Sequence, residues 1–327
     1  MKVLRYIAQD EPVVEDLPIP DIADDEVLVA ARSVGVCHSD IELLEGRYII
    51  PFEYPIIPGH EWAGEIVRVG SKVTSFAVGD RVVGECVIGD DHFGFSISGA
   101  AAEFFVAKPA WLHRLPDSIS WTNAALVEPF SVAYGALLKA GNVDASDVLV
   151  VLGAGPIGLA ITAAAAALGA RTIVVEPSPE RQQAALALGA ESAVAPGEIE
   201  AHLAEKSGGR GADVVIEASG RPDVMAQALE LAGFRARVVY VGIDVGREAP
   251  AKLGLIQSKE LAISGVIGSP EGTWPATLRF LAQTGLDLSA LVTHRFPAGQ
   301  ALDALDAAHH PVSTIKAHIE FDAVLPA

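Results

Sequence analysis

The sequence has few cysteines and few basic side chains. Cysteine occupies only two of its 327 residues, Cys37 and Cys86, which is too few for a disulfide framework in a chain of this length and favours a reducing compartment. Lys and Arg number 23 against 42 Asp and Glu, so the formal net charge is −19. Because so acidic a surface repels phosphate backbones and anionic lipid headgroups, we expect neither nucleic acid nor a membrane as a partner.

The chain also lacks an evident export signal. Its first twenty residues contain a short apolar stretch that is broken by Arg5 and has no small-residue cleavage site, so we expect a cytoplasmic protein. The apolar segment Val148–Ala170 is long enough to cross a bilayer, but it begins with β-branched residues, turns at glycines and a proline and continues as an alanine-rich run. It therefore predicts a buried strand followed by a buried helix.

Hydrophobic residues make up 50% of the sequence, and the pattern in which they recur divides the chain into three parts. Residues 1–121 are typical of short strands separated by turns. Residues 122–268 alternate strands with helices, the pattern of βαβ units on a parallel sheet. Residues 269–327 contain a helix and a last short strand, which we expect to return to the first domain. The sequence thus predicts an α/β protein with a β-rich domain in two segments around a doubly wound, parallel-sheet domain.

The stretch VLVVLGAGPIG predicts a nucleotide-binding loop between a strand and a helix. The loop consists of Gly153, Gly155, Pro156, Ile157 and Gly158, with one intervening alanine. The first glycine permits a tight turn, the second lets the backbone approach a pyrophosphate, and the third lets the helix pack closely on the strand. An ordinary strand-to-helix turn is the alternative interpretation.

The residues after this loop favour a dinucleotide site. A second strand ends at Glu176, about 20 residues further on, where a carboxylate can accept hydrogen bonds from the adenosine ribose. A carboxylate there repels a 2′-phosphate, so we predict NAD in preference to NADP. Arg181, in the first turn of the next helix, is a candidate to lie over the adenine, although a solvated position on the helix face is an equal alternative.

Four side chains predict a metal centre. They are Cys37, His60, Glu61 and Glu128. A thiolate, an imidazole and carboxylates suit Zn²⁺ and leave a coordination position for water or substrate. Their separations are too irregular for a zinc finger, so they are typical of a catalytic site assembled by the fold. We interpret Cys86 as a packed core thiol.

At this point the sequence resembles the medium-chain dehydrogenase/reductase superfamily, and in particular its zinc-dependent alcohol and polyol (sorbitol-like) dehydrogenase branch. The matching motifs, in family order, are GVCHSD at 35–40, PGHEWAGEI at 58–66, VGDRV at 78–82, LVEP at 126–129, GAGPIG at 153–158 and VVIEASG at 214–220. The resemblance implies a GroES-like catalytic domain, residues 1–121 and 269–327, around a Rossmann NAD-binding domain, residues 122–268. It also implies a homo-oligomer, either a dimer or a tetramer.

The resemblance also implies roles for individual residues. It makes Cys37 and His60 ligands of one catalytic zinc, with Glu61 able to bind the metal or move away from it. Glu128 matches the position where polyol dehydrogenases have a glutamate and simple alcohol dehydrogenases a third cysteine.

Three further positions match family residues that support the reaction. Asp40 matches the carboxylate that orients His60, and Ser39 matches the hydroxyl that passes the substrate proton outward. Lys316 falls where the family often has a basic residue near the cofactor pyrophosphate.

One lobe of the family pattern is missing. Many relatives bind a structural zinc with four clustered cysteines, whereas this chain has only VGECVIGDDHFGFSIS in that place. We therefore expect no structural zinc. The group Asp90, Asp91 and His92 within this stretch is interpreted as a polar turn instead of a metal site.

The resulting hypothesis is an enzyme that interconverts a secondary alcohol and its ketone by hydride transfer to NAD, with zinc holding the substrate oxygen. The expected partner is a small-molecule polyol, cyclitol or sugar-derived alcohol. Two alternatives remain at this level: a zinc-independent reductase that uses NADPH, and a non-catalytic nucleotide-binding scaffold.

Overall fold

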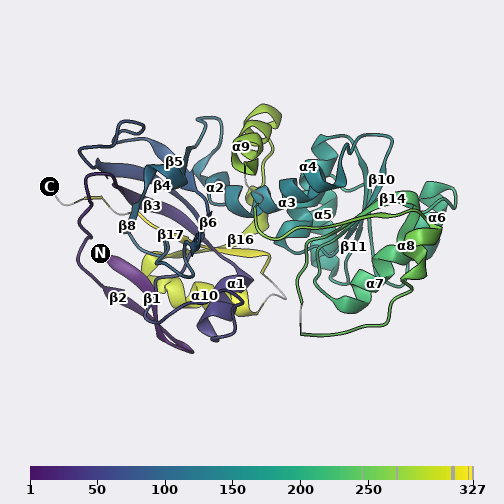
Figure 1. Ribbon diagram of the computed structural model, residues 1–327, viewed down its shortest axis with the longest axis horizontal. Coiled ribbons are helices and arrows are strands. Elements are labelled where there is room, and N and C mark those ends of the chain that lie inside the picture. Colours follow the sequence, from purple (N-terminus) through teal and green to yellow (C-terminus); the bar gives the residue numbers. More distant parts are fainter. Residues whose placement is uncertain (245, 270–271, 311–313, 323, 326–327) are drawn as a thin grey trace. The chain divides into compact units, whose positions relative to one another are not determined.

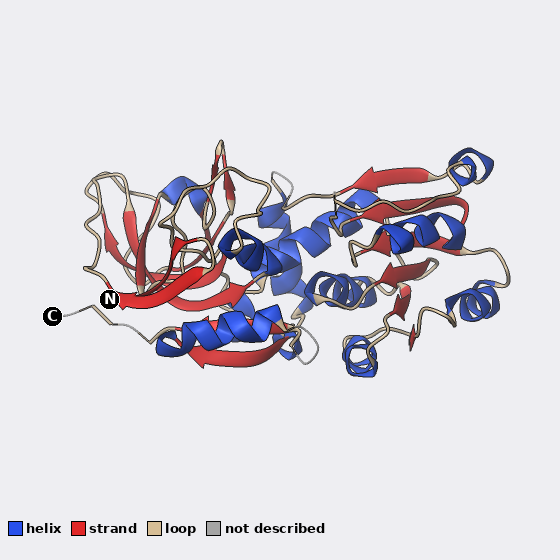
Figure 2. Cartoon of the chain, turned by 90° about the horizontal axis from the view of Figure 1, so that it is seen from below, coloured by secondary structure: helices blue, strands red, loops and turns tan. Residues whose placement is uncertain are grey.

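The computed structural model describes residues 1–244, 246–269, 272–310, 314–322 and 324–325 (Figure 1). The chain divides into two units, one formed by Met1–Glu128 with Trp274–Ala327 and the other by Pro129–Thr273. The sequence placed the corresponding boundaries at residues 121 and 269, a few residues earlier. Strands dominate the discontinuous unit, whereas helices flank the strands of the continuous one (Figure 2).

The discontinuous unit is built around a mostly antiparallel sheet. Its strands are β1 (Lys2–Ala8), β2 (Glu11–Asp16), β3 (Val27–Val36), β4 (Glu61–Val69), β5 (Arg81–Gly84), β6 (Val87–Ile88), β7 (Asp91–His92), β8 (Phe104–Ala107), β9 (Leu112–Arg114), β16 (Val292–Pro297) and β17 (Lys316–Glu320). Among the described residues, seven strands form the sheet, in the order β16-β17-β3-β4-β5-β9 with β8 also paired to β3. The predicted return of the chain's last strand to the first domain is confirmed by the antiparallel pairing of β17 with β3.

The discontinuous unit also contains short helices. They are α1 (His38–Leu44), α2 (Trp121–Ala124), α9 (Thr273–Thr284) and α10 (Ala301–His309), with 3-10 turns at Pro109–Trp111, Ser289–Leu291 and Ala298–Gln300. Strand β3 is buried along almost its whole length because it lies between neighbours on both sides, which explains why most of its residues are apolar. An aromatic group of Trp62, Phe93 and Phe105 packs in the core beside it.

The continuous unit has the Rossmann arrangement. Its strands are β10 (Val148–Leu152), β11 (Arg171–Val175), β12 (Ser192–Val194), β13 (Ala212–Glu217), β14 (Ala232–Tyr240) and β15 (Ala262–Gly265), and its helices are α3 (Val127–Ala140), α4 (Pro156–Ala167), α5 (Pro179–Ala187), α6 (Ile199–Ser207), α7 (Pro222–Leu231) and α8 (Gly254–Ser258). The strands are all parallel, in the order β12-β11-β10-β13-β14-β15. The predicted fold class is confirmed.

The strand order reverses between β10 and β13, which is where open α/β sheets bind ligands. The apolar segment Val148–Ala170 forms the buried strand β10 and the helix α4, as predicted. In the part of the chain that the structure describes, no helix is long and apolar enough to cross a membrane.

A buried histidine lies where β17 meets β3. The side chain of His318 is 0% exposed, and its Nδ1 is 2.9 Å from the hydroxyl of Ser33. Burial, with the nearby charges of Lys316 and Arg295, lowers the pKa of His318 to about 3. The folded state therefore holds this ring neutral, whereas an unfolded chain protonates it below about pH 6.5.

We predict that this histidine makes the discontinuous unit acid-sensitive. Stability should fall as the pH drops from about 6.5 towards 3, by about 2 kcal/mol at pH 5, because only the unfolded chain takes up the proton. His318→Gln should remove this part of the pH dependence. All four tryptophans lie in this unit, so urea unfolding followed by tryptophan fluorescence measures it. The exposed His310→Gln is the matched control, and an unchanged pH slope in His318→Gln would contradict the assignment.

Candidate metal centre and nucleotide-binding loop

Three of the four predicted metal ligands converge. One ligand atom from each of Cys37, His60 and Glu61 lies within 4.8 Å of the others. The antiparallel pairing of β3 with β4 explains this, because Gly35 near the end of β3 stands opposite Glu61 at the start of β4. Cys37 follows β3 directly as the N-cap of α1, and His60 immediately precedes β4. The end of one strand and the start of its neighbour thus meet at a single point.

The carboxylate of Asp40 ties these two chain segments together. It is 2% exposed, and its Oδ2 accepts a hydrogen bond from the backbone N–H of Cys37 at 2.8 Å. Its Oδ1 accepts one from Gly59 at 3.3 Å and lies 3.4 Å from Nδ1 of His60, an ion-pair distance that is long for a hydrogen bond. Asp40 therefore stands behind the imidazole, where a carboxylate fixes the orientation of a metal-binding ring.

The imidazole is electrostatically tuned by its neighbours. Burial alone would lower the pKa of His60, but Asp40 and Cys37 outweigh it, and the pKa is raised well above the usual value. The ring also packs against Phe95, with ring centroids 4.6 Å apart. Negative charge thus surrounds His60, which is the environment that a divalent cation favours.

Glu61 is held in a buried ion pair that the sequence did not reveal. Its Oε1 is 2.7 Å from Nζ of Lys316, and the two side chains are 2% and 4% exposed. Its Oε2 is buried, and no partner for it is found among the described residues. A Cβ at Gly35 would collide with this oxygen, so glycine at that position makes room for the carboxylate. The pyrophosphate contact implied for Lys316 stays a prediction, since the structure places its ammonium against Glu61.

Glu128 stands outside the group of three. It lies in the first turn of α3 and is 7% exposed. Burial raises the pKa of Glu128, His60 opposes this rise, and Glu61 adds to it. Its charge thus acts on the same cluster, although its carboxylate is not within the 4.8 Å that joins the other three ligands.

The residues present fit a zinc ion. A thiolate, an imidazole and a carboxylate form a donor set that zinc accepts, and the unpartnered Oε2 of Glu61 is a buried oxygen in need of a cation or a donor. Ser39 lies at the same place, because its hydroxyl is 3.8 Å from the Cys37 sulfur. Cys86 packs against the core, and burial raises the pKa of its thiol to about 12.

The predicted nucleotide loop has the expected local geometry. Gly153 has a φ of +101°, a conformation that favours glycine, and a Cβ at Gly158 would collide with the carbonyl oxygen of Gly153. Around Gly155, by contrast, no described atom lies within 4 Å of where a Cβ would stand. Gly155 is the N-cap of α4, so the open space faces a helix N-terminus, which favours a phosphate. Pro156 and Ile157 open the helix.

Glu176, which directly follows β11, is hydrogen-bonded to the nucleotide loop. Its Oε2 accepts a hydrogen bond from the backbone N–H of Ala154 at 2.8 Å, and its Oε1 accepts one from Ser178 at 3.0 Å. The carboxylate is only 6% exposed and has a fixed orientation. Arg181 lies in the first turn of α5, where its backbone N–H donates to the Ser178 hydroxyl at 3.3 Å.

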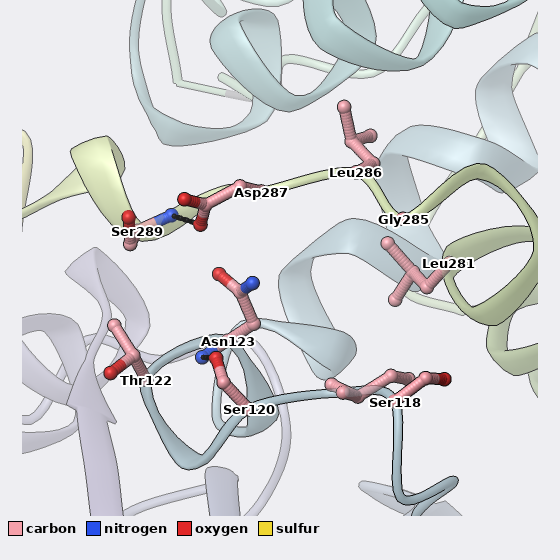
Figure 3. A pocket seen from close by; sticks show the side chains of 10 residues that line it. Ser118, Ser120, Thr122, Asn123, Leu281, Gly285, Leu286, Asp287 and Ser289 are labelled. Carbon is pink, nitrogen blue, oxygen red and sulfur yellow. Dashed lines mark hydrogen bonds between the residues drawn. The ribbon is translucent and has the colours of Figure 1, made fainter.

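A cavity of about 250 Å³ lies elsewhere, between the segment that begins α2 and the loop after α9 (Figure 3). None of the metal-cluster residues lines it. Two of its polar side chains are used in hydrogen bonds within the chain. Asp287 accepts one from the backbone N–H of Ser289 at 2.9 Å, and Asn123 accepts one from the backbone N–H of Leu288 at 3.1 Å. We therefore assign this cavity no part in the chemistry.

Comparison with known proteins defines the family. Residues 23–117 match the alcohol dehydrogenase GroES-like domain, and residues 156–283 match the zinc-binding dehydrogenase domain. Sorbitol dehydrogenase of Bacillus subtilis is 34% identical over 90% of this chain and 90% of its own. The crystal structure of 2R,3R-butanediol dehydrogenase from B. subtilis has a TM-score of 0.89 at 29% identity and covers 98% of this chain and 99% of that one.

A further solved relative carries a cofactor. An alcohol dehydrogenase from Escherichia coli CFT073, complexed with NADH, has a TM-score of 0.89 at 25% identity, covering 98% of this chain and 99% of that one. The chain belongs to the medium-chain dehydrogenase/reductase superfamily, in its zinc-type alcohol and polyol dehydrogenase branch. It is therefore an oxidoreductase of the alcohol dehydrogenase class, and the resemblance seen in the sequence is confirmed.

We predict that Lys316→Met strongly destabilises the metal-free protein. The substitution keeps an apolar stem of similar length but leaves the carboxylate of Glu61 buried without its cation, which costs about 3–5 kcal/mol. Denaturant unfolding followed by tryptophan fluorescence measures the loss. Adding Glu61→Gln should restore much of the stability because the uncompensated charge is then removed. A single variant as stable as the native protein would show that the ion pair contributes nothing.

Proposed function

We propose that this protein is a zinc-dependent and NAD-dependent dehydrogenase that interconverts a secondary alcohol and its ketone. The substrate class we propose is a polyol, a cyclitol or a sugar-derived alcohol, in line with relatives that are a sorbitol dehydrogenase and a butanediol dehydrogenase. The observation that carries the proposal is the convergence of Cys37, His60 and Glu61, with Asp40 fixed behind the imidazole.

The chemistry divides between the bound groups and the protein. A zinc ion held by Cys37, His60 and a glutamate would lower the pKa of a substrate hydroxyl, and a nicotinamide would accept the hydride. The protein holds these ligands in place through Asp40, whose bonds to Cys37 and Gly59 fix the start of α1 and the approach to β4. Lys316 balances the charge of Glu61 and so holds that carboxylate in one orientation while the metal is absent.

The position of Ser39 supports a role in moving the substrate proton. It lies in the first turn of α1, and its hydroxyl is next to the Cys37 sulfur at 3.8 Å. Glu42 follows three residues later on the same helix, a spacing that puts the two side chains on one face. We propose that the Ser39 hydroxyl receives the proton and passes it outward, toward the face of α1 that carries Glu42.

Glu176 supports the choice of NAD. Both of its oxygens are fixed by backbone N–H groups, yet each carboxylate oxygen retains capacity to accept a ribose hydroxyl. A 2′-phosphate in the same place would face this buried negative charge, so we propose a preference for NAD over NADP.

We also propose that the protein is cytoplasmic, binds no structural zinc and forms a homo-oligomer. Strand β15 is the last strand of its sheet and is largely exposed, which leaves an edge that a second copy can pair with. Light scattering on the purified protein would measure the number of subunits, and a monomer would refute this part of the proposal.

The central test is turnover with and without zinc. NADH absorbance should rise when the zinc-loaded protein is mixed with NAD⁺ and a reactive polyol, cyclitol or secondary alcohol, and chelation should abolish the rise until zinc is returned. Cys37→Ser should lose the bound metal and the turnover together, whereas the packed thiol can be replaced in Cys86→Ala with the metal retained. Full activity in metal-free protein would refute zinc dependence.

A second prediction concerns the nucleotide loop. Gly155→Ala should cost at most about 1 kcal/mol of stability, because space exists for the methyl group and only the preference for glycine at an N-cap is lost. It should weaken NAD binding about tenfold or more, because that space is where we expect the pyrophosphate to approach the backbone. Gly197→Ala is the matched control, since a Cβ at Gly197 also meets no described atom within 4 Å. Calorimetric titration with NAD⁺ measures both, and equal affinities would place the pyrophosphate elsewhere.

A further inference from the structure

Tyr48 occupies a position beside the metal cluster that the sequence did not single out. It lies in the loop that follows α1, and its ring stacks on Phe95 with centroids 4.2 Å apart and planes at 14°. Phe95 is 1% exposed and in turn packs against the ring of His60. Ring contacts thus run from the candidate ligand His60 through Phe95 to Tyr48, and the stack on Phe95 fixes where the phenol stands.

The phenol is a hydrogen-bond donor at any physiological pH. Tyr48 is half-buried, and burial raises its pKa; His60 opposes the rise, while Cys86, Cys37 and Asp40 add to it. The charges of the metal cluster therefore act directly on this hydroxyl. A tyrosine in such surroundings stays protonated and offers its O–H to an acceptor.

No acceptor within the described part of the protein uses that hydroxyl. Tyr54, a few residues along, donates to the backbone carbonyls of Leu43 and Leu44 at 2.5 and 3.1 Å, and Tyr240 donates to that of Met225 at 3.0 Å. Among the residues that the structure describes, none forms a hydrogen bond with the hydroxyl of Tyr48. Because half-buried tyrosines commonly find a partner for the O–H, this one is available to a ligand.

The surroundings also define the charge of that ligand. Arg47, next to Tyr48, is already engaged by Glu42 at 2.9 Å and by Glu45. Lys316 is engaged by Glu61, while Asp40 and Glu128 add further buried acids near the cluster. The negative charge here would repel a phosphate group, whereas it would not repel a neutral hydroxyl.

We propose that the hydroxyl of Tyr48 donates a hydrogen bond to a second oxygen of the substrate, so that the site selects neutral diols and polyols over alcohols with a single oxygen. This inference rests on the proposed function, because it assigns the substrate class of the same centre. The ring stack holds the phenol while the metal cluster holds the reacting oxygen. A site built to bond a substrate hydroxyl rejects an analogue that lacks it, because the protein group is then left without a partner.

The test compares 2,3-butanediol with 2-butanol in the zinc-loaded enzyme with NAD⁺. The native enzyme should favour the diol in kcat/KM by about tenfold or more. Tyr48→Phe keeps the ring stack and should raise the KM for the diol about tenfold, leaving the kcat and the KM for 2-butanol within about twofold. Tyr54→Phe, which removes a hydroxyl bonded only to backbone carbonyls, should keep the native preference.

Each outcome separates this inference from the proposed function. Turnover with an unchanged diol preference in Tyr48→Phe would overturn the role of Tyr48 and leave the dehydrogenase intact. A native preference for a phosphorylated polyol would also overturn it, because the negative charge around the cluster would then fail to exclude a phosphate. A native protein that binds zinc and NAD⁺ but oxidises neither alcohol, nor any other in a wider panel, would overturn the proposed function and this inference with it.

Discussion

The buried pair of Glu61 and Lys316 is the interaction on which the metal centre depends. Three carboxylates, those of Asp40, Glu61 and Glu128, are withdrawn from water around one thiol and one imidazole. Such a concentration of acids is unstable unless positive charge reaches it. Lys316 supplies part of that charge from the chain's last strand, and the ligand set leaves the rest to a cation. The same arrangement therefore explains the need for strand β17 and supports the proposal of a bound cation.

Much of the fold follows directly from local sequence. The apolar run of β10, the glycines after it and the alanine-rich helix beyond predict a Rossmann unit because each signal lies within a few residues of the next. Cys37 and His60, which lie together in the structure, were also singled out from sequence, since unusual residue types stand beside glycines and turn residues. The family comparison then confirms the class of protein to which these signals belong.

Other parts of the site depend on contacts that no local pattern encodes. Lys316 meets Glu61 across 255 residues of sequence, and only the pairing of β17 with β3 brings them together. The stack from His60 through Phe95 to Tyr48 joins three separate loops or strand ends. The spacing of these residues in the sequence does not predict that they contact one another, because aromatic side chains occur in most cores and loops. Their roles emerge only when the distances between side chains are known.

Because one unit is made of two separated segments, the two units can fold only at different times during synthesis. The Rossmann unit is one continuous segment and can fold as soon as its last strand leaves the ribosome, whereas the discontinuous unit waits for residues beyond 273. Until β17 emerges, the Ser33–Val36 end of β3 lacks its neighbour on one side, and Glu61 lacks its lysine. Nascent chains thus carry an unpaired strand edge and an unbalanced acid through most of translation, a state prone to wrong pairing. Strand β17 thus pairs the open end of β3 and supplies part of the positive charge that the buried acids need.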